Sequence, residues 1–304
     1  MTVSLSYEIF HVMLASHLNF MTKPYFHYGW VMACLAFFTT VFSSTALTTP
    51  SIILLSIAEH HGWKISDVSK SIALMFVVLA MMAPFGSALM LRIGVIKVVI
   101  LSGMLMVSGL IITIWASEKW HLLVGIGALL GTASGILGLG LSATIAIRWF
   151  EEKRGLVVGI LTSAFAAGQL IFVPFIGWLT TIADWRFAIL PATMGSIICV
   201  ILFFCFGKNW PADLGLKPYG AKSIFIPPQN TLDNPFINSF NKLKRALFHP
   251  GFWILALTFF ICGLTSNGLV TQHFIPFCSD NDVGIIAASS YLALMGVFNF
   301  LGTT

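Results

Sequence analysis

The sequence predicts an all-α polytopic membrane protein. Of its 304 residues, 58% are hydrophobic and only 9% are charged, whereas soluble domains carry about 45–50% apolar and about 25% charged residues. The apolar residues also come in runs of about 20 residues or more, which is the length that a helix needs to cross a bilayer. Composition and run length together therefore predict a bundle of membrane-spanning helices.

Eight such runs follow one another along the chain. The first six are joined by short connections and cover residues 29–56, 71–91, 95–115, 122–147, 155–182 and 186–206. A polar stretch rich in Pro, Asn and Lys separates them from two further runs, at 252–277 and 285–304. We expect one helix for each run, and we expect Pro50 to break the first one.

These runs predict four segments. Residues 1–28 form an N-terminal cytoplasmic segment, 29–206 a six-helix transmembrane bundle, 207–250 a cytoplasmic linker and 251–304 an incomplete C-terminal bundle with helices seven and eight. The last run ends at "GVFNFLGTT" without a basic cap, so we expect a truncated chain. Two alternatives stay open for the start of translation, Met1 and Met21.

The distribution of Lys and Arg predicts the orientation, because cationic loops stay on the cytoplasmic side. With a cytoplasmic N-terminus, four cations fall outside: Lys64, Lys70, Lys119 and Arg186. The other twelve of the sixteen fall inside. We expect a multi-pass protein of a bacterial inner membrane. The basic net charge then follows from topology, and nucleic-acid binding need not be invoked.

No motif predicts a metal, a cofactor or an enzyme. The five cysteines lack a CxxC pattern or a Cys/His cluster, which argues against structural zinc. Within the runs, no His, Asp, Glu, Cys and Ser constellation stands at catalytic spacing. No Asp, Glu, Lys or Arg lies deep within any run.

The loop after the second run, "PFGSALMLRIGVIKVV", resembles the signature loop of the major facilitator superfamily. Arg92, Gly94 and Lys97 fall on positions of that motif, while Leu91 replaces its acid and Ile96 one of its basic residues. In the family this loop helps to close the cytoplasmic gate, so the resemblance makes Arg92, Gly94 and Lys97 gate candidates. Ordinary positive-inside anchoring is the alternative.

Six further motifs extend the resemblance over residues 28–304. They are "YGW", "GWKISDVSKSIAL", "RWFEEKRGLVVGI", "DWRFAIL", "PADLGLKPYG" and "TQHFIPFCSDNDV". As a set they resemble the monocarboxylate transporter and oxalate/formate antiporter branch. The resemblance implies a major-facilitator-type N-terminal bundle and secondary active transport of small organic anions, monocarboxylates or dicarboxylates, by alternating access. A proton or a counter-anion would be coupled, by symport or antiport. The alternative is a non-transporting truncated remnant of such a carrier.

The stretch "RWFEEKRG" gathers five charges between the fourth and fifth runs. Headgroups and water can solvate them there, and the cations fix topology. The resemblance adds that Arg148, Glu151, Lys153 and Arg154 form part of the cytoplasmic gate.

Polar residues inside the runs are candidates for a substrate cavity, because unsatisfied polar groups are costly in a bilayer. The first and seventh helices of this superfamily face the central cavity. The candidates are Thr40, Ser44, Thr48, Gln169, Thr265, Asn267, Gln272 and His273. Alternatively, each hydroxyl bonds to its own helix, and His273 is an interfacial histidine.

Gly127, Gly131 and Gly135 recur at four-residue spacing in the fourth run. This spacing places them on one helical face, where another helix can approach closely.

Overall fold

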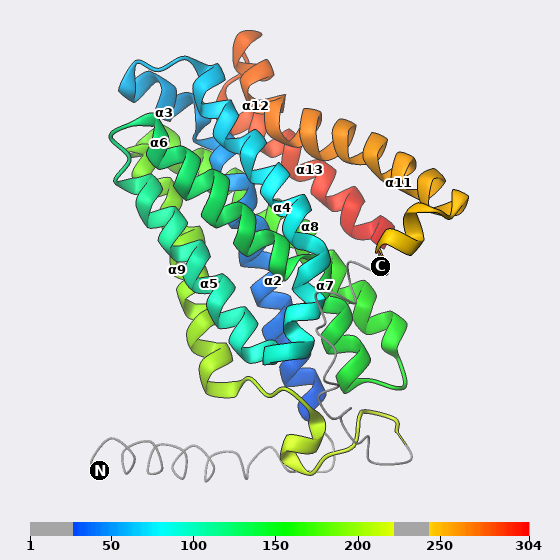
Figure 1. The fold of residues 1–304 in the computed structure, drawn as a ribbon. Helices are drawn as coiled ribbons and strands as arrows, with labels where there is room; N and C mark the ends of the chain where they lie inside the picture. Colours follow the sequence, from blue (N-terminus) through cyan, green and yellow to red (C-terminus); the bar gives the residue numbers. More distant parts are fainter. Residues whose placement is uncertain (1–26, 222–242, 304) are drawn as a thin grey trace, which may run out of the picture.

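The computed structural model describes residues 27–221 and 243–303, and long helices dominate it (Figure 1). Seven helices in this part are long and apolar enough to cross a membrane, so the predicted polytopic helical class is confirmed. The first six spans are α2 (Tyr28–Ile52), α4 (Ile65–Ile93), α5 (Val95–Ile114), α6–η1–α7 (Lys119–Leu122, Leu123–Leu130 and Gly131–Trp149), α8 (Arg154–Ile182) and α9 (Trp185–Phe206).

The helix boundaries follow from local chemistry. α2 begins after His27, whose ring accepts the N–H of Gly29 at 3.0 Å, and it breaks at Ile53, three residues after Pro50. α3 (Leu54–His61) then ends at Gly62, which adopts the left-handed φ of 64° that favours glycine. Asp184 caps α9 by accepting the N–H of Arg186 at 2.9 Å.

One boundary differs clearly from the expectation. α4 begins at Ile65, six residues before the predicted run. The polar residues of "KISDVSK" therefore form its first turns, with Asp67 in the first turn, where a carboxylate interacts favourably with the helix dipole.

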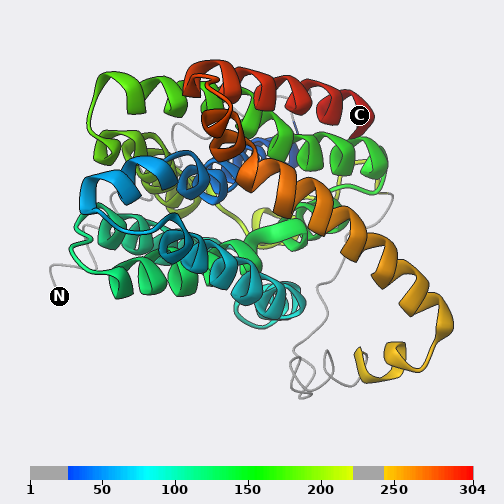
Figure 2. The same cartoon turned by 90° about the horizontal axis from the view of Figure 1, so that it is seen from above.

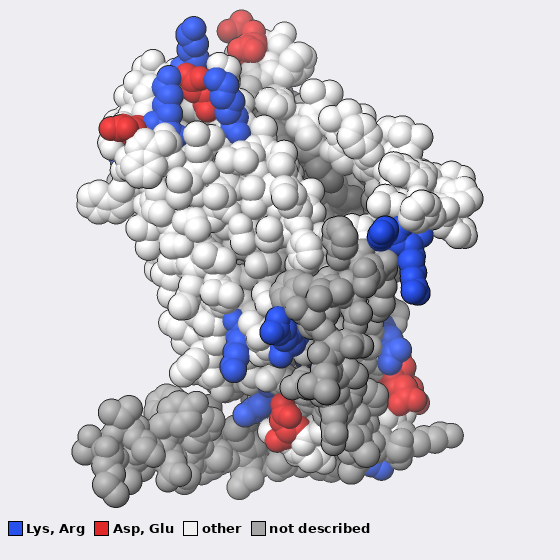
Figure 3. Space-filling view, viewed as in Figure 1, with Lys and Arg blue, Asp and Glu red and all other residues white. Residues whose placement is uncertain are grey.

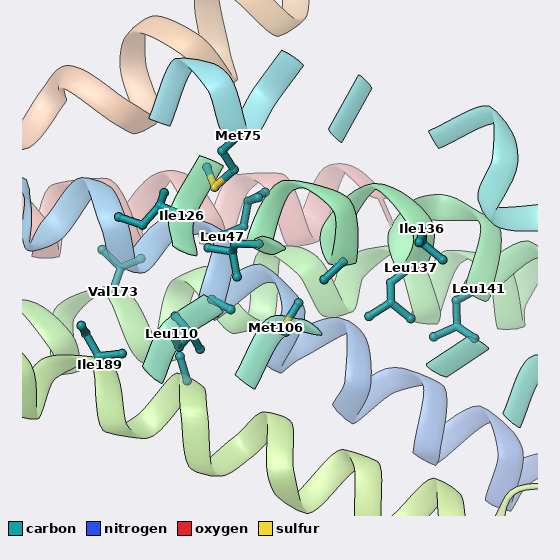
Figure 4. Packing of buried hydrophobic residues seen from close by; sticks show 14 of the residues in the cluster. Leu47, Met75, Met106, Leu110, Ile126, Ile136, Leu137, Leu141, Val173 and Ile189 are labelled. Atoms are coloured by element: carbon teal, nitrogen blue, oxygen red, sulfur yellow. The ribbon is translucent and has the colours of Figure 1, made fainter. Parts of the chain in front are cut away.

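α2 lies at the centre of the six spans and contacts α7, α8 and α9. α4 packs on α7 and η1, while α5 packs on α9 and η1. Figure 4 shows side chains from α2, α4, α5, η1, α7, α8 and α9 meeting in this core, among them Leu47, Met75, Met106, Leu137 and Val173. The first six spans thus form one packed bundle.

The later helices sit on this bundle unequally. α13 (Ile285–Thr303) packs along α8, and α12 (Thr271–Asp280) packs on α2 and α13. α11 (Pro250–Cys262) has no buried residue and diverges from the bundle (Figure 2). The π-helical η3 (Gly263–Val270) joins α11 to α12.

Charged side chains gather toward the two ends of the bundle and leave an uncharged belt between them (Figure 3). We call these ends the Arg148 end and the Asp67 end. The belt is the surface expected of a protein that exposes apolar side chains to lipid.

Candidate functional site

A cavity of about 1360 Å³ lies between the six-helix bundle and η3. Its walls come from α2, α4, α7 and α8 on the bundle side, and from α11, η3 and α12 on the other side. Each bundle helix contributes one face. On α8, Leu161, Thr162, Phe165 and Gln169 recur at three- and four-residue spacing, which brings them to a single face.

The backbone is irregular on both walls. Inside α7, Gly138 departs from helical geometry, with φ 13° and ψ −147°, and this residue lines the cavity. Opposite it, η3 is π-helical, and Gly263, Leu264, Thr265, Gly268 and Leu269 face the same space. π-helical stretches occur frequently at functional sites.

Five of the eight predicted cavity residues line this space: Thr40, Thr48, Gln169, Thr265 and His273. Ser44 does not. It is fully buried, and its hydroxyl donates to the carbonyl of Phe165 at 2.9 Å. The side chains of Asn267 and Gln272 lie outside the described part of the structure.

Six hydroxyl residues of the cavity wall were not predicted from the sequence. These are Thr39, Ser43, Ser69, Ser134, Ser142 and Thr162. Helical spacing from Gln169 could have identified Thr162, which lies seven residues earlier on the same face.

The cavity wall is nearly free of charge. Among the described residues that line it, none is Asp, Glu, Lys or Arg, and His273 is the one titratable side chain. No group of three or more His, Cys, Asp or Glu within the described ranges could hold a metal ion. The site can therefore bind a small molecule through hydrogen bonds and apolar contacts.

Arg148 has a specific environment at the opposite end from Asp67. It is only 5% exposed, in a chain segment whose other charged residues are exposed. Its guanidinium donates to the carbonyls of Met90, at 3.2 Å, and Asn209, at 3.3 Å. The group also lies 4.1 Å from the ring centroid of Trp210. Arg148 thus joins α7 to the end of α4 and to the segment after α9.

The predicted signature loop meets the same segment. Gly94 has φ 91°, which favours glycine, and a Cβ atom there would lie 2.6 Å from the Asn209 Oδ1 atom. That oxygen accepts the N–H of Ile96 at 3.3 Å, at the start of α5. Arg92 and Lys97 are exposed beside this turn.

Three of the quoted motifs meet beside Arg148. The Tyr219 N–H donates to Trp149, and the Tyr219 carbonyl accepts the N–H groups of Glu151 and Glu152. The Trp30 ring lies 5.2 Å from the ring of buried Phe150, measured between centroids. We call the set His27, Tyr28, Trp30, Phe150 and Tyr219 the aromatic clamp.

Two further bonds tie the start of α2 to the segment after α9. The Tyr28 hydroxyl donates to the Phe206 carbonyl at 2.6 Å. The His27 Nε2 atom lies 2.7 Å from the Lys217 carbonyl oxygen. Because His27 Nδ1 accepts from Gly29, Nε2 carries the hydrogen and donates it.

The remaining gate candidates are exposed and bond locally. Lys153 adopts φ 57° at the start of α8, and the Arg154 Nε atom donates to the Phe150 carbonyl at 3.0 Å. The identified bonds of Arg148, Glu151 and Arg154 stay within the bundle and residues 207–221. A gating role for these residues stays a prediction.

Ion pairs and aromatic contacts lie at the Asp67 end. Asp67 pairs with Lys70, at 2.9 Å, and with Lys119, at 2.6 Å. The His61 ring stacks on Trp63 with centroids 4.3 Å apart. Burial lowers the pKa of His61, and the neighbouring charges of His60 and Arg186 lower it further, so its ring stays neutral at pH 7.

Comparison with known proteins connects this fold to a family. The family model described as Major Facilitator Superfamily matches residues 32–304. Mouse and human Monocarboxylate transporter 11 are each 31% identical to this chain, over 271 and 275 residues. These matches cover 89% and 88% of this chain, and 56% and 53% of the two relatives. The chain thus spans about half the length of these relatives.

Bacterial relatives and solved structures agree with this match. The uncharacterized MFS-type transporter YcxA of Bacillus subtilis is 23% identical over 90% of this chain and 63% of its own length. The fold is similar to the xylose transporter XylE from E. coli in a partially occluded inward open conformation. That similarity has a TM-score of 0.63 at 14% identity, over 90% of this chain and 71% of XylE.

Proposed function

The chain belongs to the Major Facilitator Superfamily, and we propose that the carrier to which these helices belong performs secondary active transport of small organic anions by alternating access. Its relatives are transporters rather than enzymes, and several are named monocarboxylate transporters. Those names support a carboxylate as the substrate, monocarboxylate or dicarboxylate. A proton or a counter-anion is the proposed coupled ion, in symport or antiport.

The cavity between the six-helix bundle and η3 carries this proposal. Alternating access requires a site between two groups of helices that move against each other. Here α2, α4, α7 and α8 form one wall of the site, while α11, η3 and α12 form part of the other. Thr40, Thr48, Gln169, Thr265 and His273 are the predicted residues that line it.

The segments and the orientation belong to the same proposal. Residues 29–206 form the first transmembrane bundle and 207–250 a cytoplasmic linker, so the Arg148 end faces the cytoplasm. Arg92, Gly94, Lys97, Arg148, Glu151, Lys153 and Arg154 then lie at the cytoplasmic gate. Two sets of contacts support a shared role at that end. Glu151 and Arg154 bond to the aromatic clamp, while Arg148 and Gly94 both contact Asn209.

Uptake and binding assays together test the proposal. Residues 1–304 are reconstituted in phosphatidylcholine vesicles, and uptake of radiolabelled lactate, formate and oxalate is compared with empty vesicles. We expect saturable binding of at least one carboxylate to the purified chain. We expect no saturable uptake by residues 1–304 alone, because within the described structure no residue of α11 is buried.

The outcomes separate the candidate functions. Saturable uptake by residues 1–304 would contradict the need for more helices. Binding without uptake fits a chain that holds part of a carrier, and the DNA beyond codon 304 then shows whether further spans follow in any reading frame. Binding of none of the three anions would remove the carboxylate class and leave only the superfamily.

A further inference from the structure

The threonine hydroxyls around the cavity have no hydrogen left for a bound anion. Each donates its single O–H to a carbonyl of its own span, at 2.8–3.0 Å, as Thr162 does to Val158 at 2.9 Å. A hydroxyl in this state can accept a hydrogen bond but cannot donate a second one. The residues concerned are Thr39, Thr40, Thr48, Thr162, Thr265 and Thr271.

Gln169 differs from all of them. Its side chain is half-buried on the cavity face of α8, and no hydrogen bond to it is identified in the described part of the structure. Its amide carries two N–H donors and, unlike a hydroxyl, a glutamine amide is poorly placed to bond to its own helix. Because this amide faces an open cavity and is not tied to its own helix, both N–H groups can donate to a molecule that enters the cavity.

The serines of the wall are weaker candidates. Ser43, Ser69 and Ser142 line the cavity without an identified hydrogen bond in the described structure. Each has a single hydroxyl, which can rotate to a carbonyl of the preceding turn, as the Ser196 hydroxyl does to Ala192. The Ser134 hydroxyl is buried. Gln169 is therefore the one double donor among the described side chains of the cavity.

We propose that Gln169 determines substrate specificity by donating hydrogen bonds from its side-chain amide to a carboxylate oxygen of the transported anion. Phe165, one turn earlier on the same face, contacts the apolar part of that anion. This inference rests on the proposed function and adds to it the donor group that binds the substrate. No acidic side chain lines the described wall, so nothing there repels the anion, and the amide N–H groups bond more strongly to a charged carboxylate than to a neutral carbonyl of equal shape.

The affinities of a charged and a neutral ligand of similar shape test this proposal. Lactate and lactamide have nearly the same shape and differ in charge. Equilibrium dialysis at pH 7.5 gives the affinity of the purified 304-residue chain for each. A hydrogen bond to a charged group contributes about 1.5–3 kcal/mol, so Gln169→Leu should weaken lactate binding about tenfold or more. Lactamide binding should change much less.

Two further variants complete the design. Gln169→Glu keeps the size of the side chain but adds a negative charge, and we expect it to weaken lactate binding further. Thr181→Val is the control, because Thr181 lies on the same helix, is exposed, and does not line the cavity. Thr181→Val should bind lactate with the affinity of the unaltered chain. All three variants should unfold at the same midpoint temperature as the unaltered chain.

The outcomes distinguish this inference from the proposed function. If the unaltered chain binds no carboxylate, the proposed function fails. If it binds lactate and Gln169→Leu binds lactate equally well, the role of Gln169 is wrong while the function stands. An equal loss of lactate and lactamide binding would show that Gln169 does not distinguish the charged ligand from the neutral one, which also overturns the inference.

Discussion

Arg148 is a buried cation whose identified hydrogen bonds go to main-chain carbonyls. Its guanidinium bonds to two main-chain carbonyls and lies over the Trp210 ring. Arginine suits this environment, since its planar group is weakly hydrated and offers several donors in a fixed geometry. Arg148 therefore stabilises the bundle by joining three segments that are distant in sequence.

We expect Arg148→Met to destabilise the protein by about 2 kcal/mol, because hydrogen bonds from a charged group are lost and two carbonyls are left without this donor. Arg148→Lys should recover only part of the loss, since a single ammonium cannot reproduce the spacing of the two bonds. Unfolding of the purified chain in detergent, followed by circular dichroism, measures both effects.

Arg154→Gln is the matched control for Arg148. Arg154 is exposed, and its identified hydrogen bond among the described residues goes to Phe150, one turn earlier, so its loss should change stability by less than about 0.5 kcal/mol. Equal stability of Arg148→Met and Arg154→Gln would contradict the joining role of Arg148. If Arg148→Met changed transport without changing stability, a role of Arg148 in the cytoplasmic gate would be favoured instead.

For single residues, the sequence predicted part of the candidate cavity. Thr40, Thr48 and Gln169 line the cavity because polar residues at helical spacing do mark one face of a span. Ser44 shares their spacing but packs against α8, where Gly168 leaves room for it. That outcome depends on the rotation of α2 against α8, which no pattern within a single helix determines.

The glycines of η1 and α7 explain how closely α4 can approach. A Cβ atom on Gly131 would lie 2.7 Å from the Met75 carbonyl oxygen, and one on Gly135 would lie 2.6 Å from that of Leu79. A Cβ atom on Gly127 would lie 2.7 Å from the Cδ2 atom of the Leu74 side chain. The three glycines at four-residue spacing therefore form one interface with α4, as expected of small residues between membrane helices.

We expect Gly131→Ala to destabilise the bundle by about 1–3 kcal/mol, because the added methyl group forces α7 away from a backbone atom that cannot move freely. Gly155→Ala is the control. A Cβ atom at Gly155 has no neighbour within 4 Å, and alanine favours the helix more than glycine does. Its stability should be equal or higher, as judged by the same unfolding measurement.

Similar stability of the two alanine variants would show that α4 and α7 are not closely packed at Gly131. A loss in both variants would instead indicate a general sensitivity to substitution. Only the contrast between Gly131 and Gly155 supports the close-packed interface.

The spans were predicted well because about 20 apolar residues in a row have few alternatives to a membrane helix. The errors have local causes. α4 is longer than its apolar run, since Asp67 is stabilised by Lys70 and Lys119 at the helix start. The π-helical η1 and η3 and the irregular Gly138 were not predicted. They depend on packing between helices rather than on composition.

Both ends of the six-helix bundle carry cations and acidic side chains (Figure 3). Lys64, Lys70, Lys119 and Arg186 flank helix termini at the Asp67 end, and three of them make ion pairs or hydrogen bonds there. The larger number of cations predicted for the cytoplasm includes Arg148 and its neighbours. We therefore predict that the Asp67 end faces away from the cytoplasm.

Cysteine accessibility tests this orientation. In a variant without the five native cysteines, Lys64→Cys should react with a membrane-impermeant maleimide in intact cells. Glu152→Cys should react only after the membrane is permeabilised. Both positions are exposed, so a difference in labelling reports the side of the membrane.

The reverse labelling pattern would invert the topology and move the proposed cytoplasmic gate to the outer face. Labelling of both positions in intact cells would show that the chain does not adopt one orientation. Expression of each variant is checked by labelling after permeabilisation.

The aromatic clamp has a consequence for chain connectivity. The hydrogen bond between His27 and Lys217 joins positions 190 residues apart, so the two ends of the six-helix bundle are already neighbours. Closing a loop between ends held together adds little entropic penalty. The bundle is therefore suited to circular permutation, with a short peptide joining these ends and new termini opened at the exposed turn around Gly62.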